Sequence, residues 1–347
     1  MAYTTIDKPS DYFNTKLYTG TGSSNSVTGV GFQPDWVWIK SRSDAQSNNI
    51  FDSVRGQGKL IFTDANSAEA TVTNRLTAFN SDGFTVVSDN AVNGSSKTYA
   101  SWNWKAGTSF TNDASSTGIG TIDSTGSVSS DSGFSIIKYT GTGSAGTIAH
   151  GLGKKPDWII VKAYQGGQQW AVQHAALGAT KGIRINTTAA AYTSSTRWNN
   201  TEPTSSVFSV GNEAEVNTNT EDHIAYCFAE KKGYSKFGSY TGNGNADGTF
   251  VYTGFKPAIT ITKRTDSTSD WQLNDDKRDP FNPSNKLLLP NTSGAEATSS
   301  SYNMDFLSNG FKFRNTLNNQ NASGSYIYMA FAENPFVTSS GVPATAR

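Results

Sequence analysis

Short runs of alternating apolar and polar residues recur along the chain, separated by turns rich in Gly, Ser, Thr and Asn. The clearest run follows Pro34, where Trp36 and Trp38 point to one side of a strand and Val37 and Ile39 point to the other. Because both sides are apolar, the pattern predicts an internal strand that is covered on each face. Amphipathic windows with helical periodicity are almost absent, so we predict an all-β protein.

The same motif occurs three times, at residues 31–40, 153–162 and 254–263. Each copy begins with Gly, has Pro three residues later and ends on Lys, and Pro suits the entry of a strand because it lacks a backbone donor. The third copy replaces Asp-Trp by Ala258-Ile259 and has Thr260 and Thr262 on the second face. The face that carries the tryptophans is therefore the one that every copy is expected to bury.

Other landmarks repeat in the same order, which predicts tandem units. Tyr18, Tyr139 and Tyr240 each begin a Tyr-Thr-Gly turn, and they are separated by 121 (139 − 18) and 101 (240 − 139) residues. We predict three tandem antiparallel β-sandwich repeats, jelly-roll-like, of about 100 residues each. The expected divisions are an N-terminal arm (1–11), repeat 1 (12–107), a Gly/Ser/Thr-rich linker or loosely held hairpin (108–132), repeat 2 (133–232), repeat 3 (233–336) and a C-terminal tail (337–347).

The charge balance excludes several partners. The chain has 28 basic and 28 acidic residues, and only 16% of its residues are charged, so we expect neither nucleic-acid binding nor attraction to anionic lipid.

Cys227 is the only cysteine, which rules out an intrachain disulfide. No apolar run approaches the roughly 18 residues of a membrane span, and the N-terminal residues lack the apolar core of a signal peptide. We expect that the chain is made in the cytoplasm and that it does not insert into a membrane.

Candidate chemistry is sparse. His150, His174 and His223 have no companions at metal-ligand spacing, and we expect His174 to have a surface or packing role. The acidic stretch 274–279 lacks the spacing of a calcium loop and contains two basic residues, so it is read as a solvated loop. We therefore predict no metal, no cofactor and no enzyme activity, although carboxylates that meet only in space for glycoside hydrolysis stay an open alternative.

Most tryptophans lie on strand patterns and are expected in the core. Trp198 differs because it lies in a polar stretch of the second repeat. Exposed aromatic rings bind sugars by stacking, so Tyr192, Arg197 and Trp198 are the candidate ligand-binding platform, facing a glycan or a protein. The alternative for this stretch is a loop that covers the core.

The first unit also resembles a known family. The matching segments are residues 8–13, 16–20, 30–40, 51–56, 81–84 and 102–107. Together they are similar to a repeated domain of virion proteins from tailed bacteriophages, many of which infect marine bacteria. The second and third copies are divergent, and the second lacks the Asp-Gly before Phe208.

The resemblance implies a non-enzymatic structural or adhesive protein of the virion. The leading expectation is a tail fibre or host-recognition adhesin, and the alternative is a capsid decoration or head-fibre protein. A second alternative, from another class, is a carbohydrate-binding module or polysaccharide depolymerase. The expected partners are further copies of the chain, with a trimer as one arrangement, other virion proteins through the termini, and a glycan or protein of the host surface.

Overall fold

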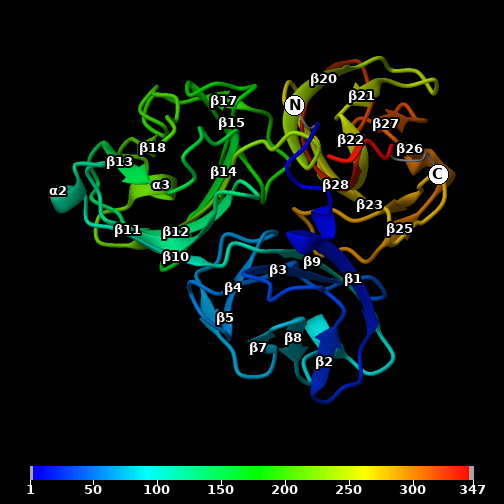
Figure 1. The fold of residues 1–347 in the computed structure, drawn as a ribbon, viewed down its shortest axis with the longest axis horizontal. Coiled ribbons are helices and arrows are strands. Elements are labelled where there is room, and N and C mark those ends of the chain that lie inside the picture. The colour runs from blue at the N-terminus through cyan, green and yellow to red at the C-terminus, as the bar shows by residue number, and fades with distance from the viewer. Residues whose placement is uncertain (1–2, 344–347) are drawn as a thin grey trace.

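The computed structural model describes residues 3–343, and antiparallel β-sheets dominate it, which confirms the prediction of an all-β protein. Three groups of sheets lie around a common centre as the corners of a triangle (Figure 1). We call them the N-terminal unit (12–107), the middle unit (108–232) and the C-terminal unit (233–336). The sequence pattern suggested sandwiches in series, whereas the structure packs them against one another.

The N-terminal unit contains a large sheet and a small sheet. The large sheet has the order β1 (Phe13–Thr19), β9 (Thr98–Trp104), β3 (Trp36–Ser41), β4 (Asn49–Asp52), β5 (Lys59–Phe62), β6 (Ala70–Thr71). The small sheet has the order β2 (Asn25–Thr28), β8 (Gly83–Val86), β7 (Leu76–Asn80). A single helical turn, α1 (Asn90–Asn93), precedes the last strand, and a 3-10 turn at Pro9–Asp11 precedes the first.

The middle unit repeats this order and extends it at one edge. Its large sheet runs β10 (Thr108–Asn112), β11 (Ser124–Ser129), β12 (Phe134–Thr140), β19 (Asp222–Phe228), β14 (Trp158–Ala163), β15 (Ala171–His174), β16 (Lys181–Arg184), β17 (Tyr192–Thr193). Its small sheet pairs β13 (Gly146–Ala149) with β18 (Val207–Val210), and α3 (Ala214–Asn217) precedes β19.

The segment 108–132, expected as a linker or a loosely held hairpin, contains an antiparallel hairpin. It forms β10, the short helix α2 (Ala114–Thr117) and β11, and β11 pairs with β12 along residues 125–129. The segment is therefore part of the sheet of the middle unit.

The C-terminal unit has the order β20 (Ser235–Gly242), β28 (Gly324–Pro335), β22 (Phe255–Arg264), β23 (Trp271–Asp275) in its large sheet. Its small sheet has the order β21 (Phe250–Tyr252), β27 (Gly310–Phe313), β26 (Met304–Leu307). A third pair joins β24 (Lys286–Leu287) to β25 (Ala297–Thr298), and a 3-10 turn occupies Ser300–Tyr302.

The two faces of each repeated strand enter two different cores. Val37 and Ile39 pack into the sandwich core of the N-terminal unit, whereas Trp36 and Trp38 join a core that all three units share. In the middle unit Ile159 and Val161 face the local core, and Trp158 and Ile160 face the shared one. The period-two pattern thus explains why both faces of this strand are apolar.

The shared core has a triangle of aromatic rings at its centre, one from the last strand of each unit. The ring centroids of Trp104 and Phe331 are 5.7 Å apart, those of Phe228 and Phe331 are 5.8 Å apart, and those of Trp104 and Phe228 are 6.5 Å apart. Buried aromatic pairs at such distances stabilise a core beyond the area that they bury. The three units are consequently held together by apolar burial.

The N-terminal arm folds back onto its own chain. Thr4 Oγ1 donates to Lys232 O at 2.8 Å, Ile6 is buried in the shared core, and the backbone N–H of Ser339 donates to Asp7 Oδ1 at 2.6 Å. The arm thus contacts the end of the middle unit, the shared core and the tail. Residues 344–347 of the predicted C-terminal tail lie outside the described part of the chain.

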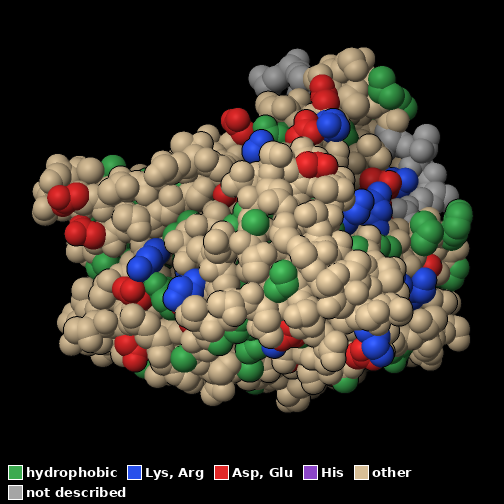
Figure 2. All heavy atoms as spheres, turned by 90° about the horizontal axis from the view of Figure 1, so that it is seen from below, with side chains coloured by type: hydrophobic (Ala, Val, Ile, Leu, Met, Phe, Trp, Pro, Cys, Tyr) green, Lys and Arg blue, Asp and Glu red, His purple; other side chains and the backbone are tan. Residues whose placement is uncertain are grey.

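The exposed surface is mostly uncharged. Figure 2 shows one face on which acidic and basic side chains are scattered among uncharged polar groups and backbone, with no extended field of one sign. No helix within residues 3–343 combines the length and the apolarity needed to cross a membrane.

Candidate functional site

The lysine that ends each repeated motif lies at a junction between units. Lys40, Lys162 and Lys263 are fully buried, and each ammonium donates to a carbonyl of a neighbouring unit: Ser293 O at 3.0 Å, Asn66 O at 3.0 Å and Thr188 O at 3.3 Å, respectively. Burial lowers the pKa of each of these lysines to about 8. The contacts run from the N-terminal to the C-terminal unit, from the middle to the N-terminal unit, and from the C-terminal to the middle unit. The three junctions therefore form a closed ring.

Two of the junctions each contain a buried ion pair of the same kind. Asp52 ends β4 and Asp275 ends β23. Each pairs with an arginine three residues later, Arg55 at 2.6 Å and Arg278 at 2.5 Å. A side chain of the adjacent unit also donates to each carboxylate: Tyr226 Oη to Asp52 at 2.7 Å and Trp102 Nε1 to Asp275 at 3.1 Å. The sequence analysis missed these residues because the partners are distant in the chain.

The outer parts of these two junctions differ at one position. At the junction of the C-terminal and N-terminal units, Glu296 accepts from Arg278 and binds Arg42 through two hydrogen bonds of 2.8 and 2.9 Å. At the junction of the N-terminal and middle units, Glu69 accepts from Arg55 at 3.0 Å, and Tyr164 takes the place of Arg42. The correspondence follows from the backbone, because Glu69 N donates to Tyr164 O as Glu296 N donates to Arg42 O.

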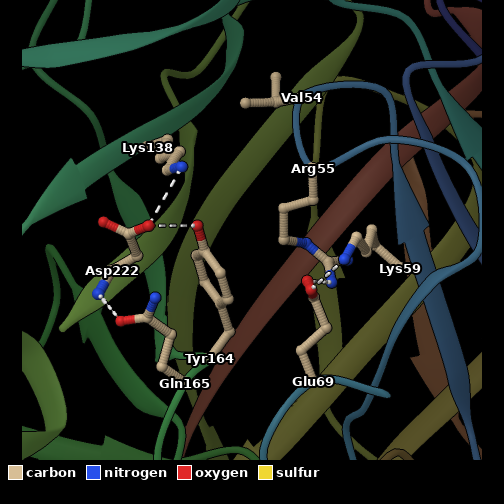
Figure 3. Close-up of a pocket in the computed structure, with 8 residues that line it drawn as sticks. All are labelled: Val54, Arg55, Lys59, Glu69, Lys138, Tyr164, Gln165 and Asp222. Atoms are coloured by element: carbon tan, nitrogen blue, oxygen red, sulfur yellow. Dashed lines mark hydrogen bonds and ion pairs between the residues drawn. The ribbon is translucent and has the colours of Figure 1, made fainter. Parts of the chain in front are cut away.

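A cavity of about 400 Å³ remains at this second junction, and we call it the junction hollow (Figure 3). Its lining comes from both units and consists of Val54, Arg55, Lys59, Glu69, Lys138, Tyr164, Gln165 and Asp222. Cavities of a few hundred Å³ are the usual size of small-ligand sites. The junction hollow is therefore the candidate functional site.

Charges in the junction hollow are matched. Lys138 Nζ lies 3.1 Å from Asp222, Lys59 Nζ lies 3.5 Å from Glu69, and Arg55 is shared between Glu69 and the underlying Asp52. Three cations thus meet three carboxylates. The charges balance once Asp52, which lies beneath the lining and pairs with Arg55, is counted with Glu69 and Asp222.

The protonation states follow from these contacts. Burial raises the pKa of the Asp222 carboxyl, but hydrogen bonds from Thr140 and Lys138 outweigh burial and the net shift is downward. Burial and the nearby Asp222 carboxylate raise the pKa of the Tyr164 hydroxyl, which donates to Asp222 at 3.2 Å. At neutral pH Asp222 is an acceptor and Tyr164 a donor. Asp222 is thus unsuited to the role of the protonated carboxyl that glycoside hydrolysis requires.

The predicted platform is not exposed. Trp198 and Arg197 have relative exposures of 0%, and Trp198 packs in the sandwich core of the middle unit. Arg197 forms ion pairs with Glu213, at 2.6 Å, and with Glu215, and it stacks over the Tyr192 ring. Of the two alternatives for this stretch, an exposed platform and a loop that covers the core, the structure has the second.

The interpretation of one other stretch changes, and His174 has the packing role, one of the two expected for it. The stretch 274–279 is not a solvated loop, because Asp275, Asp276 and Arg278 are buried at the junction. His174 is fully buried, and its Nε2 lies 3.4 Å from Tyr328 O of the C-terminal unit. No cluster of three His, Cys, Asp or Glu side chains suited to a metal ion occurs within residues 3–343.

A comparison with protein families finds one match, a domain of unknown function named DUF7483, over residues 8–335. No curated protein matches the chain in sequence. The match covers the three units and both sides of the junction hollow, and the chain belongs to the DUF7483 family.

Proposed function

We propose that this chain is a non-enzymatic structural protein of a bacteriophage virion that acts as a tail fibre or host-recognition adhesin. The proposal begins from the resemblance of residues 8–107 to repeated virion domains. The structural observation that carries it is the shared aromatic core, which joins three sandwiches into one body. Such a body can project many loops while keeping its shape outside a cell.

The surface supports the same role. Acidic and basic residues balance, and uncharged polar side chains cover much of the face in Figure 2. A surface of this kind avoids indiscriminate attachment to charged material and leaves selectivity to particular sites.

A capsid decoration or head-fibre protein is the second candidate. The arrangement that favours it is the set of three similar sheets around one centre (Figure 1). Icosahedral shells have threefold axes, on which an internally threefold chain can be seated. Further copies of the chain and other virion proteins would then meet its outer loops, because residues 3–7 already contact the same chain.

The test is to purify virions of the phage that encodes the chain and to locate it by mass spectrometry and cryo-electron microscopy. Density at the tail supports the adhesin, and density over the shell supports the decoration protein. Absence from purified particles, with the chain present in the infected-cell lysate, would contradict both forms of the proposal.

A further inference from the structure

We propose that the junction hollow between the N-terminal and middle units binds a short, neutral saccharide. This inference rests on the adhesive form of the proposed function and deepens it by naming a ligand class and a site. It is carried by the shape of one junction, by the polar groups in it and by their charge balance.

The first argument is the contrast between two equivalent junctions. At the junction of the C-terminal and N-terminal units, the Arg42 guanidinium fills the outer position and holds Glu296 with two hydrogen bonds. Tyr164 in the corresponding position turns its hydroxyl toward Asp222, away from Glu69 (Figure 3). The space that an arginine closes at one junction is open at the other.

The second argument is the hydrogen-bonding capacity of the lining. The side chains of Lys59 and Lys138 are 38% and 39% exposed and have donors to spare beyond their carboxylate partners. Asp222 and Glu69 supply acceptors, and the Gln165 amide, whose oxygen accepts from Asp222 N at 2.8 Å, has its nitrogen as a further donor. Sugar hydroxyls both donate and accept, so adjacent hydroxyls match a site in which donors and acceptors alternate.

The third argument concerns charge. Every cation of the junction hollow already has a carboxylate within 3.5 Å, so an anionic ligand would compete with existing ion pairs. A neutral polyhydroxylated ligand can bridge these pairs without breaking them. Tyr164 is only 7% exposed and offers no stacking face, so we expect weak binding that becomes useful through many copies on one particle.

The experiment uses the full chain and saturation-transfer NMR with neutral di- and trisaccharides of glucose, galactose, mannose and N-acetylglucosamine. Sulfated and phosphorylated forms of the same sugars are the second arm. Lys138→Ala and Gln165→Ala remove donors, and Tyr164→Arg introduces the residue type that occupies the equivalent junction. Lys155→Ala is the matched control, because its ion pair with Glu202 is similarly exposed and lies outside the hollow.

We expect a neutral sugar to bind the unaltered chain and the control equally, and to bind Lys138→Ala and Gln165→Ala about tenfold or more weakly. Tyr164→Arg should abolish binding with the thermal midpoint retained. Absence of binding by every neutral sugar, binding of the charged forms alone, or binding unaffected by all three variants would each overturn the inference. A sugar-binding chain absent from virions would contradict the proposed function alone, and a virion chain that binds no sugar would contradict this inference alone.

Discussion

His174 occupies the position at which the other two units have an aspartate. The strand registers establish this, because Trp36 pairs with Asp52, Trp158 with His174 and Ile259 with Asp275. Leu177 lies where the other units have arginine, so the arginine that pairs with Asp52 and with Asp275 has no counterpart three residues after His174. Burying a neutral imidazole at this junction costs less electrostatic free energy than burying an unpaired carboxylate.

The contacts of His174 predict that acid destabilises the fold. Burial lowers the pKa of His174 to about 4, and its Nδ1 accepts from Ala176 N at 3.0 Å, so a second ring proton would lose this acceptor. The unfolded chain binds a proton near pH 6.5 and the folded chain does not, so the stabilising contribution is complete above about pH 6.5 and is lost as the pH falls toward about 4. The expected loss is about 3 kcal/mol over this window.

Urea unfolding of the unaltered chain and of His174→Gln at intervals from pH 7.5 to 4.5 measures this effect. The free-energy difference between the two proteins should shrink as the pH falls. Burial also lowers the pKa of His150 to about 4, so His150→Gln should give a similar slope from a site away from the junction. A difference that stays constant with pH would contradict the assignment.

The Tyr-Thr-Gly turns show how one buried side chain orders an element. Asn93, Asn217 and Asn321 are fully buried, one beside the turn of each unit. The Asn217 side chain accepts from Thr142 N at 2.8 Å and donates to Ser144 O at 2.6 Å and to Gly211 O at 2.7 Å. These bonds satisfy the backbone of the turn in place of a strand partner.

Asn217→Ala should therefore lower the free energy of unfolding by about 2–4 kcal/mol, because it removes three hydrogen bonds and leaves buried backbone groups unpaired. Asn321→Ala should have a comparable effect in the C-terminal unit. Asn219→Ala, at a nearby exposed position, is the control and should cost less than about 0.5 kcal/mol. Equal urea midpoints for Asn217→Ala and Asn219→Ala would refute this role.

Alternation alone predicted the repeated strands, because period two is a local property that both cores enforce at Trp36 and Val37. It left residues 108–132 open between a linker and a hairpin, because they are mostly polar and gain their order from pairing, β10 with β11 and β11 with β12. It also left Trp198 open between an exposed platform and a core-covering loop, because a buried ring in a polar stretch has no periodic signal. The junction hollow could not be predicted from the sequence, since Arg55 and Asp222 line one cavity only when two units pack together.

At the scale of the whole molecule, the shared core makes the three units depend on one another. The N-terminal unit contributes Trp36, Trp38, Trp102 and Trp104 to this core, and each is at most 1% exposed. A tryptophan buries about 150–250 Å². An isolated unit would expose an apolar patch larger than the few hundred Å² that monomers usually tolerate.

We therefore expect the full chain to unfold in a single cooperative transition, and the excised middle unit, residues 108–232, to aggregate or to stay unfolded. Calorimetry of the full chain and circular dichroism of the segment measure the two outcomes. Phe228→Ala removes one ring of the central triangle and should shift the whole transition downward by about 3–5 kcal/mol without splitting it. Separate transitions for the three units, or a segment 108–232 that folds as a monomer, would show that the local sandwich cores are sufficient and that the shared core only joins finished domains.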